Sequence, residues 1–102
     1  MQRGTDPAPL RVLRLLEAMV GGVVDGLTPR EIIRITGYTA SNTSRDLRTL
    51  EAAGWARQLP GGRWTLTEKP AALLKIYGLH LQRLTEQARD FDLRANARAR
   101  QL

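Results

Sequence analysis

The chain has 102 residues, with 16 Lys and Arg against 10 Asp and Glu and a net charge of +6. We expect this length to hold one small domain with a modest core and to exclude a separate catalytic or sensing domain. The positive charge favours a polyanionic partner, and the absence of Cys excludes disulfides and thiolate metal sites.

No stretch of the sequence predicts a membrane segment or an active site. The first ten residues lack the apolar run of a signal peptide, and no run is long enough to span a bilayer, so we expect a cytoplasmic protein. There is no phosphate loop, no zinc spacing and no nucleophile beside a base. His80 stands alone, and Asp90 and Asp92 splay too far apart on a helix to share a metal. We predict no enzyme activity, metal or cofactor.

Residues 1–9 contain Gly, Thr, Asp and two prolines, which predicts a flexible N-terminal arm. Apolar residues from Leu10 to Val20 then cover more than one side of a helix, which predicts a core helix. Its apolar positions are Leu10, Val12, Leu13, Leu15, Leu16, Met19 and Val20. Its charged positions, expected outside, are Arg11, Arg14 and Glu17. Gly21 and Gly22 end the helix, and residues 23–27 suit an extended segment able to pair with a later hairpin.

A short helix is predicted to begin at Pro29. Thr28 is a suitable N-cap, Pro29 tolerates the missing donor of the first turn, and Glu31 completes a capping box. Gly37 supplies the left-handed residue that ends this helix. Its apolar face consists of Ile32, Ile33 and Ile35.

A second helix is predicted after the turn, with Thr39 as its cap. Thr43, Leu47 and Leu50 recur at steps of four and three and turn inward. The opposite face carries donors and positive charges, namely Ser41, Asn42, Ser44, Arg45, Arg48 and Thr49. This pattern is typical of a helix-turn-helix whose second helix enters a major groove, although ordinary helical bundles also contain such pairs.

A β-hairpin is predicted next. Residues 55–59 and 63–67 are two strand-like runs, and Pro60, Gly61 and Gly62 form the turn between them. Arg57 and Arg63 lie where the wing of a winged helix reaches phosphate. The order of elements over residues 10–67 therefore predicts a winged helix-turn-helix.

Two stretches resemble the N-terminal DNA-binding domain of isocitrate-lyase-regulator (IclR) type transcription factors, namely VLRLLEAMVGG and LTPREIIRITGYTASNTSRDLRTLEAAGWARQLPGGRWTLT. The matching positions are Glu31, Gly37, Ser41, Arg45, Leu47, Leu50, Gly54, Trp55, Gly62, Trp64 and Leu66. Asn42 and Asp46 depart from the pattern, which usually has Thr and an apolar residue there. The resemblance covers residues 10–67 and implies a DNA-binding winged helix. It implies a free-standing one, without the family's effector domain, as small phage or mobile-element regulators are built.

Residues 68–102 form the third predicted part of the chain, a C-terminal helix with a basic tail. The helix is predicted to run from Pro70 to about Asp92. Apolar residues at heptad spacing form a seam on it, namely Leu74, Tyr77, Leu81, Leu84, Ala88, Phe91 and Ala95. Such a seam pairs helices between subunits or folds back on its own domain. Leu73, Ile76 and Leu79 widen the apolar face, so we expect the first turns to pack on the winged helix and the later turns to dimerise.

The end of the chain is strongly basic. Residues 69–102 carry seven basic and three acidic groups, a net +4, against nine and seven, a net +2, in residues 1–68. Residues 93–102 contain Arg94, Arg98 and Arg100 and are either a frayed helix end or a phosphate-binding tail. The C-terminal region would then belong to any DNA footprint.

The sequence thus predicts a mainly α fold with a small β-hairpin, a winged helix-turn-helix followed by a long helix. We expect sequence-specific binding of double-stranded DNA by a small, homodimeric transcriptional regulator. The alternatives are a protein-interaction module that docks on a partner protein, or a nonspecific accessory factor of replication or a mobile element. The residues expected to contact DNA are Thr39, Ser41, Asn42, Ser44, Arg45, Arg48, Thr49, Arg57 and Arg63. Those expected to dimerise are Leu74, Tyr77, Leu81, Leu84, Ala88 and Phe91.

Overall fold

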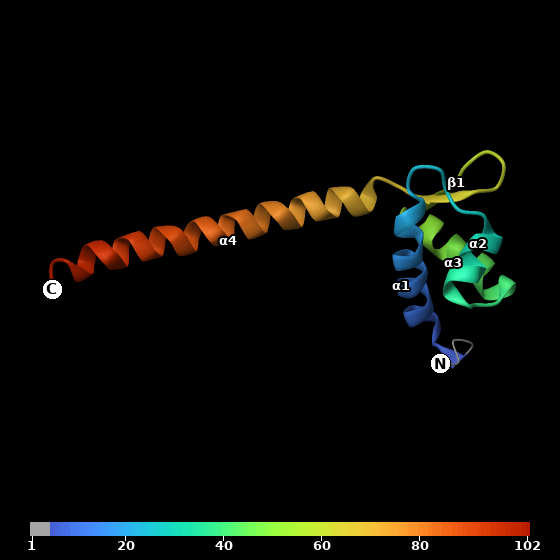
Figure 1. Ribbon diagram of the computed structural model, residues 1–102, viewed down its shortest axis with the longest axis horizontal. Coiled ribbons are helices and arrows are strands. Elements are labelled where there is room, and N and C mark those ends of the chain that lie inside the picture. The colour runs from blue at the N-terminus through green and yellow to red at the C-terminus, as the bar shows by residue number, and fades with distance from the viewer. Residues whose placement is uncertain (1–4) are drawn as a thin grey trace. The chain divides into compact units, whose positions relative to one another are not determined.

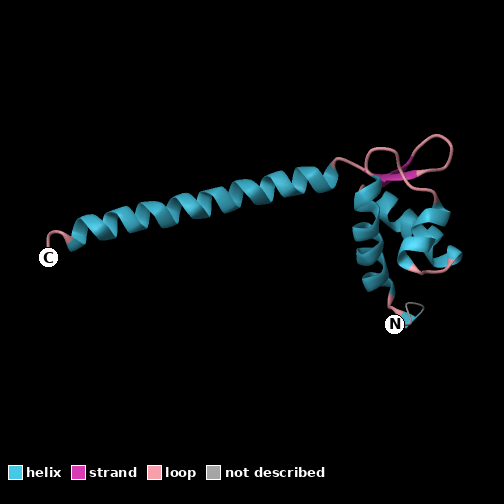
Figure 2. Ribbon diagram, in the orientation of Figure 1, coloured by secondary structure: helices cyan, strands magenta, loops and turns pink. Residues whose placement is uncertain are grey.

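The computed structural model describes residues 5–102 and divides the chain into two compact units, one up to Pro70 and one from Ala71 to Leu102. The helices of the N-terminal unit pack together with a hairpin beside them (Figure 1). Figure 2 shows strands only in that hairpin. In chain order the elements are α1 (Ala8–Met19), the 3₁₀ turn η2 (Val20–Gly22), α2 (Pro29–Thr36), α3 (Ala40–Ala52), β1 (Ala56–Gln58), β2 (Trp64–Leu66) and α4 (Lys69–Ala99). This confirms the predicted fold class.

Helix α1 begins at Ala8, two residues before the predicted start, because Pro9 fits the first turn of a helix, where its missing N–H is not needed. The expected arm is shortened accordingly, and residues 1–4 of it lie outside the described part of the chain. The buried positions of α1 are Arg11, Leu15 and Met19, at steps of four. The predicted orientation was therefore wrong at Arg11, which is buried, and at Leu13 and Val20, which are 58% and 61% exposed.

Helix α2 begins and ends as the sequence predicts. The hydroxyl of Thr28 accepts a hydrogen bond from the N–H of Glu31 at 3.1 Å, and Pro29 is the first helical residue. Gly37 ends the helix with φ 76°, a left-handed conformation that favours glycine. The predicted apolar face is partly wrong: Ile35 is exposed, and Thr36, four residues after the buried Ile32, takes the inner position.

The hairpin forms at the predicted place, with β1 and β2 antiparallel and Arg57 opposite Thr65. The extended segment before α2 pairs with it only at Leu27, whose N–H and carbonyl both bond to Trp64 at 2.8 Å. Residues 20–22 form a 3₁₀ turn at the end of α1, and residues 23–25 form a further turn, so the predicted extended segment over residues 23–27 is wrong in its first half. Trp64 is buried between the hairpin and the helices, so this tryptophan supplies the large apolar surface that joins them.

One cluster of buried side chains holds the N-terminal unit together, with contributions from all three of its helices and both strands. These residues are Leu15, Met19, Ile32, Leu47, Leu50, Ala56, Trp64 and Leu66. The side of α3 that carries Leu47 and Leu50 packs in this cluster, so the opposite side of α3 faces solvent.

Helix α4 runs to Ala99, seven residues beyond the predicted end, because residues 93–99 are mostly Ala, Arg and Leu, which favour helices. None of its residues is buried. The packing of its first turns on the winged helix stays a prediction. Within residues 5–102, no helix has the length and apolar character needed to cross a bilayer.

Candidate nucleic-acid interface

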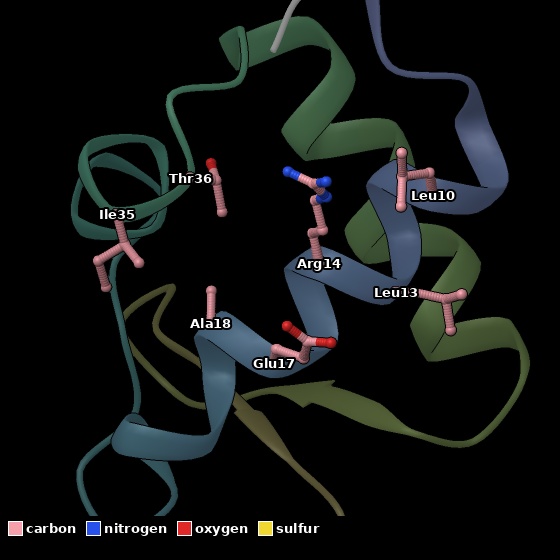
Figure 3. Close-up of a pocket in the computed structure, with 7 residues that line it drawn as sticks. All are labelled: Leu10, Leu13, Arg14, Glu17, Ala18, Ile35 and Thr36. Carbon is pink, nitrogen blue, oxygen red and sulfur yellow. The ribbon is translucent and has the colours of Figure 1, made fainter. Parts of the chain in front are cut away.

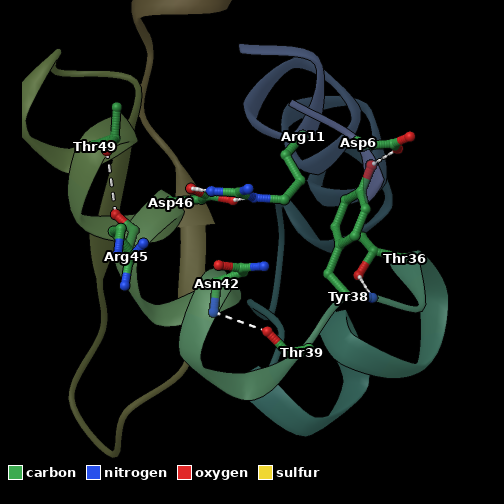
Figure 4. A network of polar contacts seen from close by, with 9 residues as sticks. All are labelled: Asp6, Arg11, Thr36, Tyr38, Thr39, Asn42, Arg45, Asp46 and Thr49. Atoms are coloured by element: carbon green, nitrogen blue, oxygen red, sulfur yellow. Dashed lines mark hydrogen bonds and ion pairs between the residues drawn. The ribbon is translucent and has the colours of Figure 1, made fainter. Parts of the chain in front are cut away.

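The outer face of α3 presents the side chains that the sequence predicted. Ser41, Ser44 and Thr49 are exposed and Asn42 is half-buried, while Thr43, Leu47 and Leu50 are buried as expected. The hydroxyl of Thr39 caps the helix by accepting a hydrogen bond from the N–H of Asn42 at 3.1 Å (Figure 4). An N-cap of this kind stabilises a helix by about 1 kcal/mol and fixes its first turn, where the base-reading residues of a recognition helix lie.

Asp46 lies on the inner side of α3 and pairs with Arg11 from α1. The guanidinium donates from Nε to Oδ2 at 2.7 Å and from Nη2 to Oδ1 at 3.0 Å, a bidentate geometry (Figure 4). The hydrogen bond with Asp46 raises the pKa of Arg11 above its ordinary value. The pair neutralises the one carboxylate in the middle of the recognition helix and links that helix to α1.

Sequence reasoning missed this pair. A signal for it existed: Asp46 breaks an apolar position of α3 and Arg11 falls four residues before Leu15 on the buried face of α1. Two opposite charges on the inner faces of two helices are expected to meet, because a buried charge needs a partner.

Arg45 is the basic side chain of α3 that stays available. It is exposed, and among residues 5–102 its guanidinium forms no ion pair or hydrogen bond; only its backbone carbonyl accepts one, from Thr49 Oγ1 at 3.2 Å. In Figure 4 its side chain extends away from the pair formed by Arg11 and Asp46. A free guanidinium on this face suits bidentate contact with guanine or phosphate.

Arg48, also predicted to contact DNA, is held on the protein. Its Nη1 donates to Glu51 Oε1 at 3.0 Å, and its guanidinium carbon lies 5.3 Å from the centre of the Trp64 ring. The pair with Glu51 lies within α3, three residues apart, and the contact with Trp64 links α3 to the hairpin. Arg48 therefore offers less free charge than Arg45.

Of the two arginines of the hairpin, Arg57 is free within residues 5–102 and Arg63 is held by contacts with the protein. Arg57 is exposed, and no hydrogen bond or ion pair of its side chain occurs in the described part of the chain. Arg63 donates to the carbonyl of Gly26 at 3.2 Å and lies 3.6 Å from Glu31 Oε1. The structure thus leaves Arg57 as the free charge of the wing and uses Arg63 to attach the hairpin to the start of α2.

The turn between α2 and α3 is fixed by Tyr38, a residue the sequence did not single out. Its hydroxyl donates to Asp6 Oδ2 at 2.8 Å, and its N–H donates to Thr36 Oγ1 at 3.2 Å (Figure 4). Asp6 also lies 3.8 Å from Arg14 Nη1. Tyr38 is buried, so its ring and its two hydrogen bonds hold the turn before α3 against the N-terminal segment.

A cavity of about 550 Å³ lies between α1 and α2, away from the outer face of α3 (Figure 3). Its lining is Leu10, Leu13, Arg14, Glu17, Ala18, Ile35 and Thr36. It contains none of the residues predicted to contact DNA. Among residues 5–102, no group of three or more His, Asp or Glu side chains could hold a metal ion.

A sequence model of the MarR family matches residues 3–63, more than half of the chain. The match spans α1, the helix-turn-helix, β1 and the hairpin turn, and ends directly before β2. The IclR type is not supported, because the matching family is a different one; the resemblance came from the winged helix-turn-helix that both share. No curated protein matches the chain. From this match and from the capped helix pair with its adjoining wing, the chain belongs to the MarR family and contains a winged helix-turn-helix DNA-binding domain.

Proposed function

We propose that this protein binds double-stranded DNA at a specific sequence and acts as a small transcriptional regulator. The observation that carries the proposal is the face of α3, where an exposed, unpaired Arg45 stands beside Ser41 and Ser44 on a capped helix. The carboxylate next to Arg45, that of Asp46, is turned inward and neutralised. A helix with this surface fits a major groove.

The proposed DNA contacts are of two kinds, contacts with bases and contacts with phosphate. Arg45 is the candidate for a bidentate bond to guanine, with Ser41 and Asn42 hydrogen-bonding base edges or phosphate near the start of the helix. Arg57 on the wing contacts flanking phosphate. Arg48 and Arg63 add positive potential but keep their protein contacts, so their share of the binding free energy is smaller.

A homodimer completes the proposal. The seam of α4 has seven apolar or small residues at heptad spacing, all exposed in the single chain. Burying it against a second copy would present two recognition helices to successive major grooves and imply an inverted-repeat site. The basic residues of the tail would then add phosphate contacts without sequence preference.

Selection of bound duplexes from a random library, followed by fluorescence anisotropy across a salt series, tests this function. We expect an enriched inverted repeat and an affinity that falls steeply with salt. Binding with a steep salt dependence but no enriched site would indicate a nonspecific accessory factor instead. Absence of binding at low salt would indicate a protein-interaction module.

A further inference from the structure

The seam of α4 has no partner within its own unit, where every residue from Ala71 to Leu102 is exposed. Its six residues expected to dimerise are Leu74, Tyr77, Leu81, Leu84, Ala88 and Phe91. The helix has 31 residues and a length of about 46 Å. A row of apolar side chains at heptad spacing along such a helix is the arrangement that a second helix covers. Which way that second helix runs is the open question.

We propose that α4 pairs with α4 of a second copy in the antiparallel direction, in one defined register. In this register Leu74 faces Phe91 of the second copy, Tyr77 faces its Ala88, and Leu81 faces its Leu84. A single two-fold axis between residues 82 and 83 generates all of these pairs, so each of the six residues finds a partner. The proposal rests on the dimeric regulator proposed above and specifies how it assembles.

The sizes of the side chains favour this direction. Two of the antiparallel layers combine a large residue with a smaller one, namely Tyr77 with Ala88 and Phe91 with Leu74. The third layer combines two residues of equal size, Leu81 and Leu84. Alternation of this kind fills the space between helices evenly. A parallel pair in register would place Tyr77 against Tyr77, Phe91 against Phe91 and Ala88 against Ala88. That arrangement has two crowded layers and one with a void, both of which are destabilising.

The charges beside the seam are compatible with the same register. His80 falls next to Gln87 of the second copy on one flank, and Gly78 falls next to Thr85 on the other. Asp92 falls beside Ala71 of the second copy and one turn from its Lys75, so a carboxylate and an ammonium group come together twice by symmetry. No like charges face each other at the positions that border the seam.

The register also fixes a distance. Ala71, the first residue of the C-terminal unit, lies at the same height along the helix pair as Arg94 of the second copy. The two Ala71 residues are therefore about 23 residues, or about 35 Å, apart along the pair. A parallel pair would instead bring both Ala71 residues to the same level.

Because the chain contains no Cys, single-Cys variants of the full chain report the direction of pairing. His80→Cys, Gln87→Cys and Thr85→Cys change exposed flanking residues and leave the seam intact. Variants are refolded together in pairs, treated with a short bismaleimide and analysed by mass spectrometry, with circular dichroism as a check of folding. We expect H80C to crosslink efficiently with Q87C and poorly with T85C.

A parallel pair predicts the reverse, because His80 would then border Thr85 of the second copy, and that result would overturn the proposal. A monomer in sedimentation equilibrium with no crosslinking in either mixture would also overturn it and would favour a helix that folds back on its own chain. Crosslinking and sedimentation are measured on the protein without DNA, so their outcome does not depend on DNA binding. Failure of DNA binding with efficient crosslinking of H80C to Q87C would overturn the proposed function alone.

Discussion

Arg11 and Asp46, 35 residues apart in sequence, form a buried bidentate ion pair between the first helix and the inner side of the recognition helix. The pKa of Arg11 is raised in the folded state, so the charged Arg11 adds to the free energy of unfolding. This stabilisation is fully present below the ordinary arginine pKa and is lost only as the pH rises above it. Arg11 therefore remains charged at neutral pH, where the pair holds α3 against α1.

Replacing Asp46 by Ala leaves the Arg11 charge without its partner. We expect Asp46→Ala to lower the free energy of unfolding by about 3 to 5 kcal/mol, as when one member of a buried ion pair is removed. Urea denaturation followed by circular dichroism measures this. The double variant Arg11→Met, Asp46→Leu replaces both charges by apolar groups and should recover most of the loss. A loss below about 1 kcal/mol for Asp46→Ala would show that the pair acts like an exposed one.

Glu51 holds Arg48 on the surface of α3 at 3.0 Å. Glu51→Gln removes a negative charge near the proposed phosphate contacts and releases Arg48, so we expect DNA affinity to rise by about 0.5 to 1 kcal/mol, or roughly two- to fivefold. Anisotropy at fixed salt measures the change. Glu17→Gln on α1 removes the same charge elsewhere. An equal gain in both variants would mean that only net charge changed.

The free and the held arginine of the wing are expected to differ when each is replaced by Ala. Arg57→Ala should weaken binding to all sequences similarly and lower the slope of log affinity against log salt by about 1. Arg63→Ala should change binding less but lower stability by up to about 1 kcal/mol, because half-exposed Arg63 attaches the hairpin to Gly26 and Glu31. A larger loss of affinity for Arg63→Ala than for Arg57→Ala would reverse these roles.

Leu84 and Leu79 provide a matched test of the seam on α4. The two side chains are 62% and 63% exposed and differ in that only Leu84 lies on the seam. We expect Leu84→Glu to weaken dimerisation at least 100-fold, about 3 kcal/mol, and Leu79→Glu to change it little. Sedimentation equilibrium measures both. Similar dissociation of the two variants would mean that the seam does not define the interface.

Local signals in the sequence predicted the frame of the domain. The cap at Thr28, the cap at Thr39 and the left-handed Gly37 each depend on residues within one helical turn, so they can be read without the fold. The hairpin turn at residues 60–62 is local in the same sense. These elements also produced the likeness to a winged helix, which two families share and which therefore did not identify the family.

Contacts between distant residues could not be predicted in this way. The apolar residues of α1 lie on more than one side, and only packing against α3 decides that Arg11 is buried and Leu13 exposed. Likewise the sequence treats Arg45, Arg48, Arg57 and Arg63 alike. Glu51 is a local partner of Arg48, three residues away on the same helix. Only the fold brings Arg48 to Trp64 and Arg63 to Gly26 and Glu31, and so separates them from the two free arginines.

The most direct test of sequence-specific recognition by α3 compares Arg45→Ala with the natural chain on two duplexes, the selected site and a shuffled version of it. At one salt concentration, anisotropy should show a loss of about 1 to 3 kcal/mol on the selected site and a much smaller loss on the shuffled one, because a base contact is removed. Equal losses on both duplexes would contradict the account, since Arg45 would then contact only the DNA backbone.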